Sequence, residues 1–139
     1  MKIMICCSTA FYDKVEEISD YLLKKGYEVI YPNGYLENSF ELVDDVSEEE
    51  YSKFFKDMFL ESIEKIKHSD AIVVLNYTKR KNGEDLANYI GASTFLEMYE
   101  AFVNDKKIYM MNDFPDNMLL DEIKGFRPII LNGDINNLN

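Results

Sequence analysis

The sequence lacks any apolar segment long enough to cross a membrane. No stretch approaches the roughly 20 consecutive apolar residues that a membrane-spanning helix needs. A secretory signal is not indicated either, because Asp13, Glu16 and Glu17 follow directly after a short apolar stretch that carries a single lysine. These absences predict a soluble, cytoplasmic protein without a membrane partner.

Cysteine and histidine are scarce. The two cysteines, Cys6 and Cys7, are adjacent, and neighbouring residues of a strand point to opposite faces, so a disulfide between them is implausible. We interpret them as reduced thiols in the core of a cytosolic protein, with a redox or metal role as the alternative. His68 is the only histidine, and we interpret it as a helix C-terminal cap favoured by the helix dipole. The sequence therefore predicts no metal site and no cofactor.

Features that bind phosphate chains are also few. The 15 Lys and Arg residues are outnumbered by 26 Asp and Glu, which gives a net charge of −11. Such a surface repels phosphate backbones, so we expect no nucleic-acid partner. Neither the GxGxxG fingerprint nor a GxxxxGK[ST] loop occurs. A single small phosphate held by backbone amides at a helix start remains compatible with this charge.

The residues that are present suffice for one α/β domain over residues 1–139. With 47% apolar and 14% aromatic residues, a chain of this length buries roughly 68% of its unfolded surface. Apolar segments alternate with helical patterns, which specifies a five-stranded, parallel, doubly wound sheet. The expected strands are residues 2–8, 27–31, 70–76, 107–112 and 128–132. We expect the flavodoxin-like order 2-1-3-4-5, with the ligand crevice between the first and third strands.

Helical spacing of apolar residues predicts that the segments between these strands are helices. The first helix ends at Gly26, and the second begins at a capping box from Ser47 to Glu50. The second helix carries a broad apolar stripe of Tyr51, Phe54, Phe55, Met58, Phe59, Ile63 and Ile66. A third helix over about residues 93–104 has Phe95, Met98, Tyr99 and Phe102 on one face, and a short fourth ends at Gly125.

Three segments read as irregular. The acidic stretch 37–50 is expected to be a mobile, solvated loop, because it carries seven acids and no base. Residues 77–88 are predicted to form a long polar loop. The polar C-terminal tail, residues 132–139, is expected to fray or to pack on a neighbouring molecule.

Ligands of such sheets bind at the carboxyl ends of the strands, which selects three loops. These are Ser8-Thr9-Ala10-Phe11-Tyr12 after the first strand, Asn76 after the third, and Asn112-Asp113 after the fourth. Each also has a purely structural interpretation. Ser8 and Thr9 suit a helix cap, and Asn76 suits the end of a strand.

A fourth candidate is the helix start at residues 91–97. Backbone N–H groups around Gly91, Ser93 and Thr94 can bind an anion or a sugar hydroxyl there. Glu97 lies one turn into the helix, where its carboxylate can face the crevice. On the helical wheel, however, Glu97 falls opposite the aromatic residues, as an ordinary solvated residue would. Spacing alone leaves both roles open.

The segment around Glu97 resembles the signature of the nucleoside 2-deoxyribosyltransferase superfamily, which includes deoxynucleotide N-hydrolases. Residues 93–101, STFLEMYEA, and then 105–108, DKKI, are similar to the family's G-T-x-x-E-x-G-x-A stretch followed by G-K-P-[IV]. Residues 69–74, SDAIVV, resemble the family's strand entry. The motif covers a small part of the chain, whereas the expected architecture matches throughout.

The resemblance implies cleavage or transfer of an N-glycosidic bond on a small nucleoside or nucleotide. Glu97 matches the family's nucleophile, which attacks the anomeric carbon and forms a glycosyl-enzyme intermediate. Such chemistry needs an anionic carboxylate on one face of the sugar and a proton for the departing base on the other. A homodimer or larger assembly is also implied, because the family's sites are often completed by a neighbouring chain.

The chain departs from the family's pattern at several positions. Ser93 and Tyr99 replace glycines, and Lys107 replaces the proline. The two aspartates usual in the transferases fall on Ser62 and Gly91. The nucleophile is therefore kept, while the usual leaving-group acid and base-reading carboxylate are missing.

Asp57, Asp85 or Tyr12 are possible substitutes for the missing acid, and no sequence feature selects among them. The missing carboxylates leave a second interpretation, a nucleotide-binding or sensor module without turnover. NAD glycohydrolase activity is a third, because the same nucleophile cleaves a nicotinamide–ribose bond.

Overall fold

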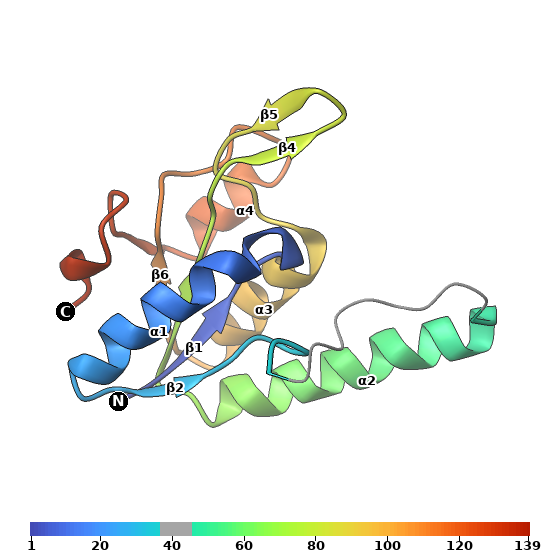
Figure 1. The fold of residues 1–139 in the computed structure, drawn as a ribbon, viewed down its shortest axis with the longest axis horizontal. Helices are drawn as coiled ribbons and strands as arrows, with labels where there is room; N and C mark the ends of the chain where they lie inside the picture. The colour runs from blue at the N-terminus through green and yellow to red at the C-terminus, as the bar shows by residue number, and fades with distance from the viewer. Residues whose placement is uncertain (37–45) are drawn as a thin grey trace.

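The computed structural model describes residues 1–36 and 46–139. They form an α/β domain built on a five-stranded parallel sheet of order β2-β1-β3-β6-β7 (Figure 1). The strands are β1 Lys2–Cys6, β2 Glu28–Ile30, β3 Ala71–Val74, β6 Lys107–Met110 and β7 Ile129–Ile130. The predicted fold class and strand order are confirmed.

Helices cover both faces of this sheet (Figure 1). One face packs on α1, and the other packs on α2, α3 and α4. The helical segments are η1 Thr9–Lys14, α1 Val15–Lys24, α2 Glu48–Lys67, α3 Ala92–Val103, α4 Leu120–Gly125 and η2 Ile135–Asn137. Each apolar strand thus supplies alternate residues to two separate cores, as a doubly wound sheet requires.

The two cysteines follow this alternation. Cys7 lies in the core under α1, and Cys6 lies in the core under α2 and α3. Both are buried free thiols. Burial raises the pKa of the Cys6 thiol well above its ordinary value, so this side chain behaves as a small apolar residue.

The structure corrects two expectations about irregular segments. Part of residues 77–88 forms an antiparallel hairpin of β4 Lys79–Lys81 and β5 Glu84–Leu86, not a loop. Asn82 and Gly83 both have positive φ, at 53° and 78°, which is the geometry of a two-residue hairpin turn. Most of the acidic stretch, residues 37–45, lies outside the described residues.

The C-terminal tail packs on its own domain, so the expectation that it frays is wrong. Leu138 is 4% exposed and joins the core under α1. The Tyr109 hydroxyl donates to the backbone oxygen of Asn139 at 2.8 Å, and the Gly133 N–H donates to the Met111 oxygen at 2.7 Å. The tail therefore extends the packing of the sheet.

Helix α2 begins and ends as predicted, but its apolar stripe does not form core. The Ser47 hydroxyl accepts from the Glu50 N–H at 3.1 Å, and His68 is the C-terminal cap. Among the apolar residues of the stripe only Ile66 is fully buried. The N-terminal half of the helix extends beyond the sheet (Figure 1). Along the stripe, Tyr51 and Phe59 are 48% and 37% exposed. No helix of the described chain has the length and apolar character of a membrane span.

Asn76 joins the carboxyl ends of β3 and β6. Its Nδ2 donates to the backbone oxygens of Asn112 and Asp113 at 3.2 and 2.9 Å, and its Oδ1 accepts from the Asn112 N–H at 2.8 Å. The Asn112 side chain donates in turn to the Asn76 backbone oxygen at 3.1 Å. Since Asn76 is fully buried, these bonds replace water and hold the two strand ends together.

Replacing Asn76 with Ala should lower the free energy of unfolding by about 3 kcal/mol, because buried backbone groups lose their partner. Urea denaturation of both proteins measures the difference. Asn136→Ala, at an exposed side chain, should change stability by less than about 0.5 kcal/mol. Equal stabilities of Asn76→Ala and the parent would contradict this structural role.

Candidate active site

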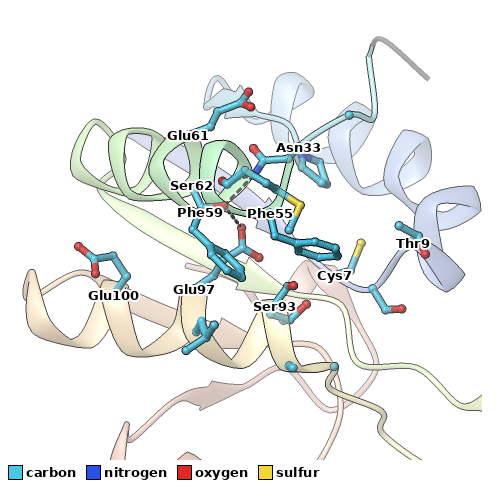
Figure 2. Close-up of a pocket in the computed structure, with 18 of the residues that line it drawn as sticks. Cys7, Thr9, Asn33, Phe55, Phe59, Glu61, Ser62, Ser93, Glu97 and Glu100 are labelled. Atoms are coloured by element: carbon cyan, nitrogen blue, oxygen red, sulfur yellow. Dashed lines mark hydrogen bonds between the residues drawn. The ribbon is translucent and has the colours of Figure 1, made fainter. Parts of the chain in front are cut away.

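A cavity of about 670 Å³ opens at the carboxyl edge of the sheet. Its walls come from the loop after β1, the turn after β2, one side of α2 and the beginning of α3 (Figure 2). Sites for small molecules commonly enclose about 300–1,000 Å³. The cavity therefore has the size of a small-molecule site.

Predicted residues from two distant parts of the chain meet in this cavity. Glu97 lines it together with Ser8, Thr9, Tyr12, Gly91, Ser93 and Thr94. Ser8 also caps η1, since its hydroxyl accepts from the Ala10 N–H at 3.3 Å. Gly91 is the N-cap of α3 and makes no side-chain cap bond, so the first N–H groups of that helix lack a side-chain acceptor.

Three other predicted residues do not line the cavity. Phe11 is 4% exposed and packs edge-on against Tyr77 in the core. Asn76 and Asn112 bind each other at the ends of β3 and β6. Asn76 and Asn112 follow strand ends, as the crevice rule requires, but backbone groups there occupy their side-chain amides.

Helix α3 presents a different face to the sheet than its aromatic pattern predicts. Its buried residues are Thr94, Met98 and Ala101, whereas Tyr99 and Phe102 are 53% and 48% exposed. The aromatic side chains of this helix gather around the ring of Phe126 instead. The helix is therefore rotated about its axis relative to the expected orientation. As a result Glu97 faces the cavity and not bulk solvent.

The Glu97 carboxylate is held by a side chain from the neighbouring helix. Ser62 of α2 is buried, and its hydroxyl donates to Glu97 Oε2 at 3.0 Å (Figure 2). Asn33, in the turn after β2, donates from Nδ2 to Ser62 Oγ at 2.7 Å and to the Met58 backbone oxygen at 3.0 Å. Because Asn33 occupies an acceptor site of the serine, the serine proton is directed at Glu97.

No sequence pattern pointed to Asn33 or to this role of Ser62. Asn33 belongs to a Pro-Asn-Gly turn signal, and its function in the site depends on where α2 packs. Ser62 stands at a position where the resembling family has an aspartate, which made it a departure from the pattern and not a candidate. The structure places both on the cavity wall.

Burial sets the protonation of Glu97. Removal from water raises its pKa from 4.5 to about 7, while the Ser62 hydrogen bond and the charge of Lys65 act in the opposite direction. Lys65 also pairs with Glu61 at 3.3 Å and donates to the Tyr31 backbone oxygen at 3.0 Å. Near neutral pH, Glu97 therefore populates both an anionic and a neutral form.

The three candidate proton donors differ in whether they line the cavity and in which group each of them contacts. Tyr12 lines the cavity and donates its hydroxyl to the Asn33 backbone oxygen at 2.7 Å. Asp57 also lines the cavity, but it is bound by Lys53 at 2.6 Å. Asp85 lies in the β4–β5 hairpin, paired with Arg80 at 3.0 Å, and is not a lining residue. Within residues 1–36 and 46–139, no three His, Cys, Asp or Glu side chains are grouped to hold a metal ion.

Comparison with known proteins adds evidence on the fold. No protein-family model matches the chain, and no curated protein sequence matches it. A CMP N-glycosidase from Clostridium botulinum, BcmB, aligns with a TM-score of 0.54 and 14% identity over 99% of this chain and 94% of that one. A 2-deoxyribosyltransferase from Bacillus psychrosaccharolyticus aligns with a TM-score of 0.50 and 19% identity over 88% and 81%.

The chain has the fold of these two enzymes. The resemblance stated from the segment around Glu97 is thereby confirmed at the level of the fold. At these identities the shared property is the arrangement of strands and helices.

Glu97 should make stability depend on pH. Its pKa in the folded state lies above its value in the unfolded chain, so its contribution is full below about pH 4.5 and is lost as the pH rises to about 7. The free energy of unfolding of the parent, relative to that of Glu97→Gln, should fall by about 2 kcal/mol between pH 5 and pH 8. Urea denaturation at both pH values measures this. Parallel pH profiles of the two proteins would contradict the buried position of the carboxylate.

Removing the Ser62 hydroxyl should raise the pKa of Glu97 further, because the anion loses its hydrogen-bond donor. For Ser62→Ala we expect an increase of about one pH unit. A carbon-13 NMR titration of the glutamate carboxyl groups measures it, with Glu97→Gln used to assign the signal. Ser93→Ala removes a hydroxyl from the same cavity without touching this bond and should leave the titration unchanged. An unchanged midpoint in Ser62→Ala would contradict the assigned contact.

Proposed function

We propose that the protein cleaves or transfers the N-glycosidic bond of a nucleoside or nucleotide, with Glu97 as the nucleophile. The observation that carries this proposal is the enclosed carboxylate, oriented by Ser62 at 3.0 Å on the wall of a cavity of small-molecule size. The similar structures support it, because one is a CMP N-glycosidase and the other a 2-deoxyribosyltransferase.

The site supports a two-step reaction. A Glu97 oxygen attacks the anomeric carbon, the bond to the base breaks, and a glycosyl ester forms. Water or a second base then attacks the anomeric carbon and releases the carboxylate. The relay from Asn33 through Ser62 keeps the attacking oxygen in one orientation, which lowers the entropic part of the barrier.

The rest of the sugar has partners among the other residues that line the cavity. The hydroxyls of Ser8, Thr9 and Ser93 line the cavity, as do the first residues of α3. Helix-start N–H groups and hydroxyls donate to sugar oxygens or to a single phosphate. We therefore assign substrate binding to Ser8, Thr9, Tyr12, Gly91, Ser93 and Thr94.

One observation favours a second candidate function, a sensor that binds a nucleotide without turnover. The positions of the two family aspartates hold Ser62 and Gly91, and the Ser62 hydroxyl already donates to Glu97. Glu97 consequently lacks the usual acid opposite it. In this interpretation the Glu97 carboxylate accepts hydrogen bonds from the ligand and does not attack the anomeric carbon, so the N-glycosidic bond stays intact.

We also propose a homodimer or larger assembly in the cytoplasm. Large apolar side chains are exposed on two adjacent helices, Tyr51 and Phe59 on α2 and Tyr99 and Phe102 on α3. Exposed apolar groups on neighbouring elements commonly mark protein contacts.

Glu97→Gln should abolish release of free base, because an amide cannot form the glycosyl ester. Incubation with a panel of nucleosides and nucleotides, followed by liquid chromatography, measures the released base. Turnover should fall by at least about a thousandfold, the scale of a lost nucleophile. Glu122→Gln, on the exposed side of α4, should keep full activity.

Two other outcomes would contradict the proposal or favour the sensor. Base release by Glu97→Gln at the parent rate would refute the nucleophile. Saturable binding of a nucleotide without turnover by the parent would favour the sensor.

A further inference from the structure

The charged side chains that line the cavity have one sign. They are Asp57, Glu61, Glu97 and Glu100, and no Lys, Arg or His of the described chain lines it. Asp57 and Glu61 pair with lysines of α2 at 2.6 and 3.3 Å. Glu97 and Glu100 have no cationic partner within 4.0 Å among the described side chains. A cavity bordered by such groups concentrates cations.

The apolar part of the wall is aromatic. Phe54, Phe55 and Phe59 of α2 and Tyr99 of α3 line the cavity, and Figure 2 shows Phe55 and Phe59 bordering it with Glu97. The ring centroids of Phe55 and Phe59 lie 6.1 Å apart at an interplanar angle of 46°. Aromatic faces beside carboxylates are the combination that binds flat organic cations.

Two hydroxyls of the cavity already donate hydrogen bonds to other groups of the protein. The Ser62 hydroxyl donates to Glu97, and the Tyr12 hydroxyl donates to the Asn33 backbone oxygen. Burial also raises the pKa of Tyr12, which makes its hydroxyl a weaker acid. Glu100 Oε1 accepts from Asn104 Nδ2 at 3.0 Å, so this carboxyl oxygen is engaged by its own helix.

We propose that the preferred substrate is an N-glycoside whose base carries a positive charge, such as a pyridinium nucleoside. The inference rests on the proposed function and names its substrate class. An aromatic cation matches the carboxylates and rings of the wall, and its base can leave without receiving a proton.

The reaction of such a substrate balances without an acid. A Glu97 oxygen bonds to the anomeric carbon while the carbon–nitrogen bond breaks. The electron pair of the broken carbon–nitrogen bond stays on the ring nitrogen. The base leaves as a neutral molecule, because this pair cancels its charge. Water then attacks the anomeric carbon, the Glu97 carboxylate is released, and the proton of the water passes to solvent.

Recognition of the cation is tested without any turnover. N1-methylnicotinamide is a pyridinium cation without a glycosidic bond, and nicotinamide is its uncharged counterpart. Isothermal titration of the parent chain at pH 8 and low salt should give about tenfold tighter binding of the cation. Equal affinities, tighter binding of nicotinamide, or no binding of the cation would overturn the proposal.

Two variants test whether the wall is responsible. Glu100→Gln removes a carboxylate, and Phe55→Leu removes an aromatic face while keeping apolar volume. Each should weaken binding of the cation severalfold and leave nicotinamide unchanged, and Glu122→Gln outside the cavity should change neither. Equal loss for both ligands would mean that shape and not charge decides binding, which overturns the proposal.

The affinity for the cation should also rise as the pH increases from 6 to 8, because Glu97 ionises near pH 7. Four other titratable groups interact electrostatically with this carboxylate. They are Lys65 of α2, Tyr12 of η1 and the thiols of Cys6 and Cys7. Burial raises the pKa of both thiols and of Tyr12, so they stay neutral in this range. Binding that does not depend on pH would contradict a contribution from Glu97.

Turnover separates this inference from the proposed function. The ratio kcat/KM for nicotinamide riboside, a pyridinium nucleoside, should exceed that for uridine or adenosine, and Glu100→Gln should reduce this preference. Release of base from neutral nucleosides without selective binding of N1-methylnicotinamide would leave the proposed function standing and refute the inference. Selective binding without release of base from any substrate would refute the proposed function and with it the assignment of the cation as a substrate, and would leave the recognition of the cation standing.

Discussion

A carboxylate that is taken out of water must find another donor, and the structure of the site depends on how Glu97 meets this requirement. The donor is the Ser62 hydroxyl, 3.0 Å away on a different helix. This contact forms only where α2 packs against α3, since Ser62 and Glu97 each lie on the side of their helix that faces the cavity. The position of α2 therefore determines the surroundings of the Glu97 carboxylate and one wall of the cavity.

The turn after β2 is the second support of this arrangement. Asn33 reaches α2 through two hydrogen bonds from one amide nitrogen. A residue at the end of a short edge strand thereby orients a carboxylate on a helix three strands further along the chain. Such indirect support is common around reactive groups, because a side chain with several rotamers is useful for chemistry only when its neighbours select one.

Features with a local physical cause could be predicted from the sequence. The strand order follows from alternating apolar segments, and the ends of α2 follow from the serine and histidine beside them. The resemblance around Glu97 led to a residue that wheel geometry alone would have placed in solvent. The rotation of α3 was not predictable, since Phe126 from another element decides where its aromatic residues pack. The role of Asn33 was not predictable either, because it depends on a tertiary contact. Its partner, Ser62, lies on α2, 29 residues further along the chain.

Two groups of side chains on α2 contribute to different properties of the molecule. Ser62 and Ile66 near its end are buried, whereas Phe54, Phe55 and Phe59 border the cavity outside both cores. Side chains outside a core can be exchanged with little effect on folding. Mutation of the segment from Phe54 to Phe59 can therefore change the lining of the cavity with little effect on folding, while the buried turns of the same helix keep the fold and the Glu97 carboxylate in place.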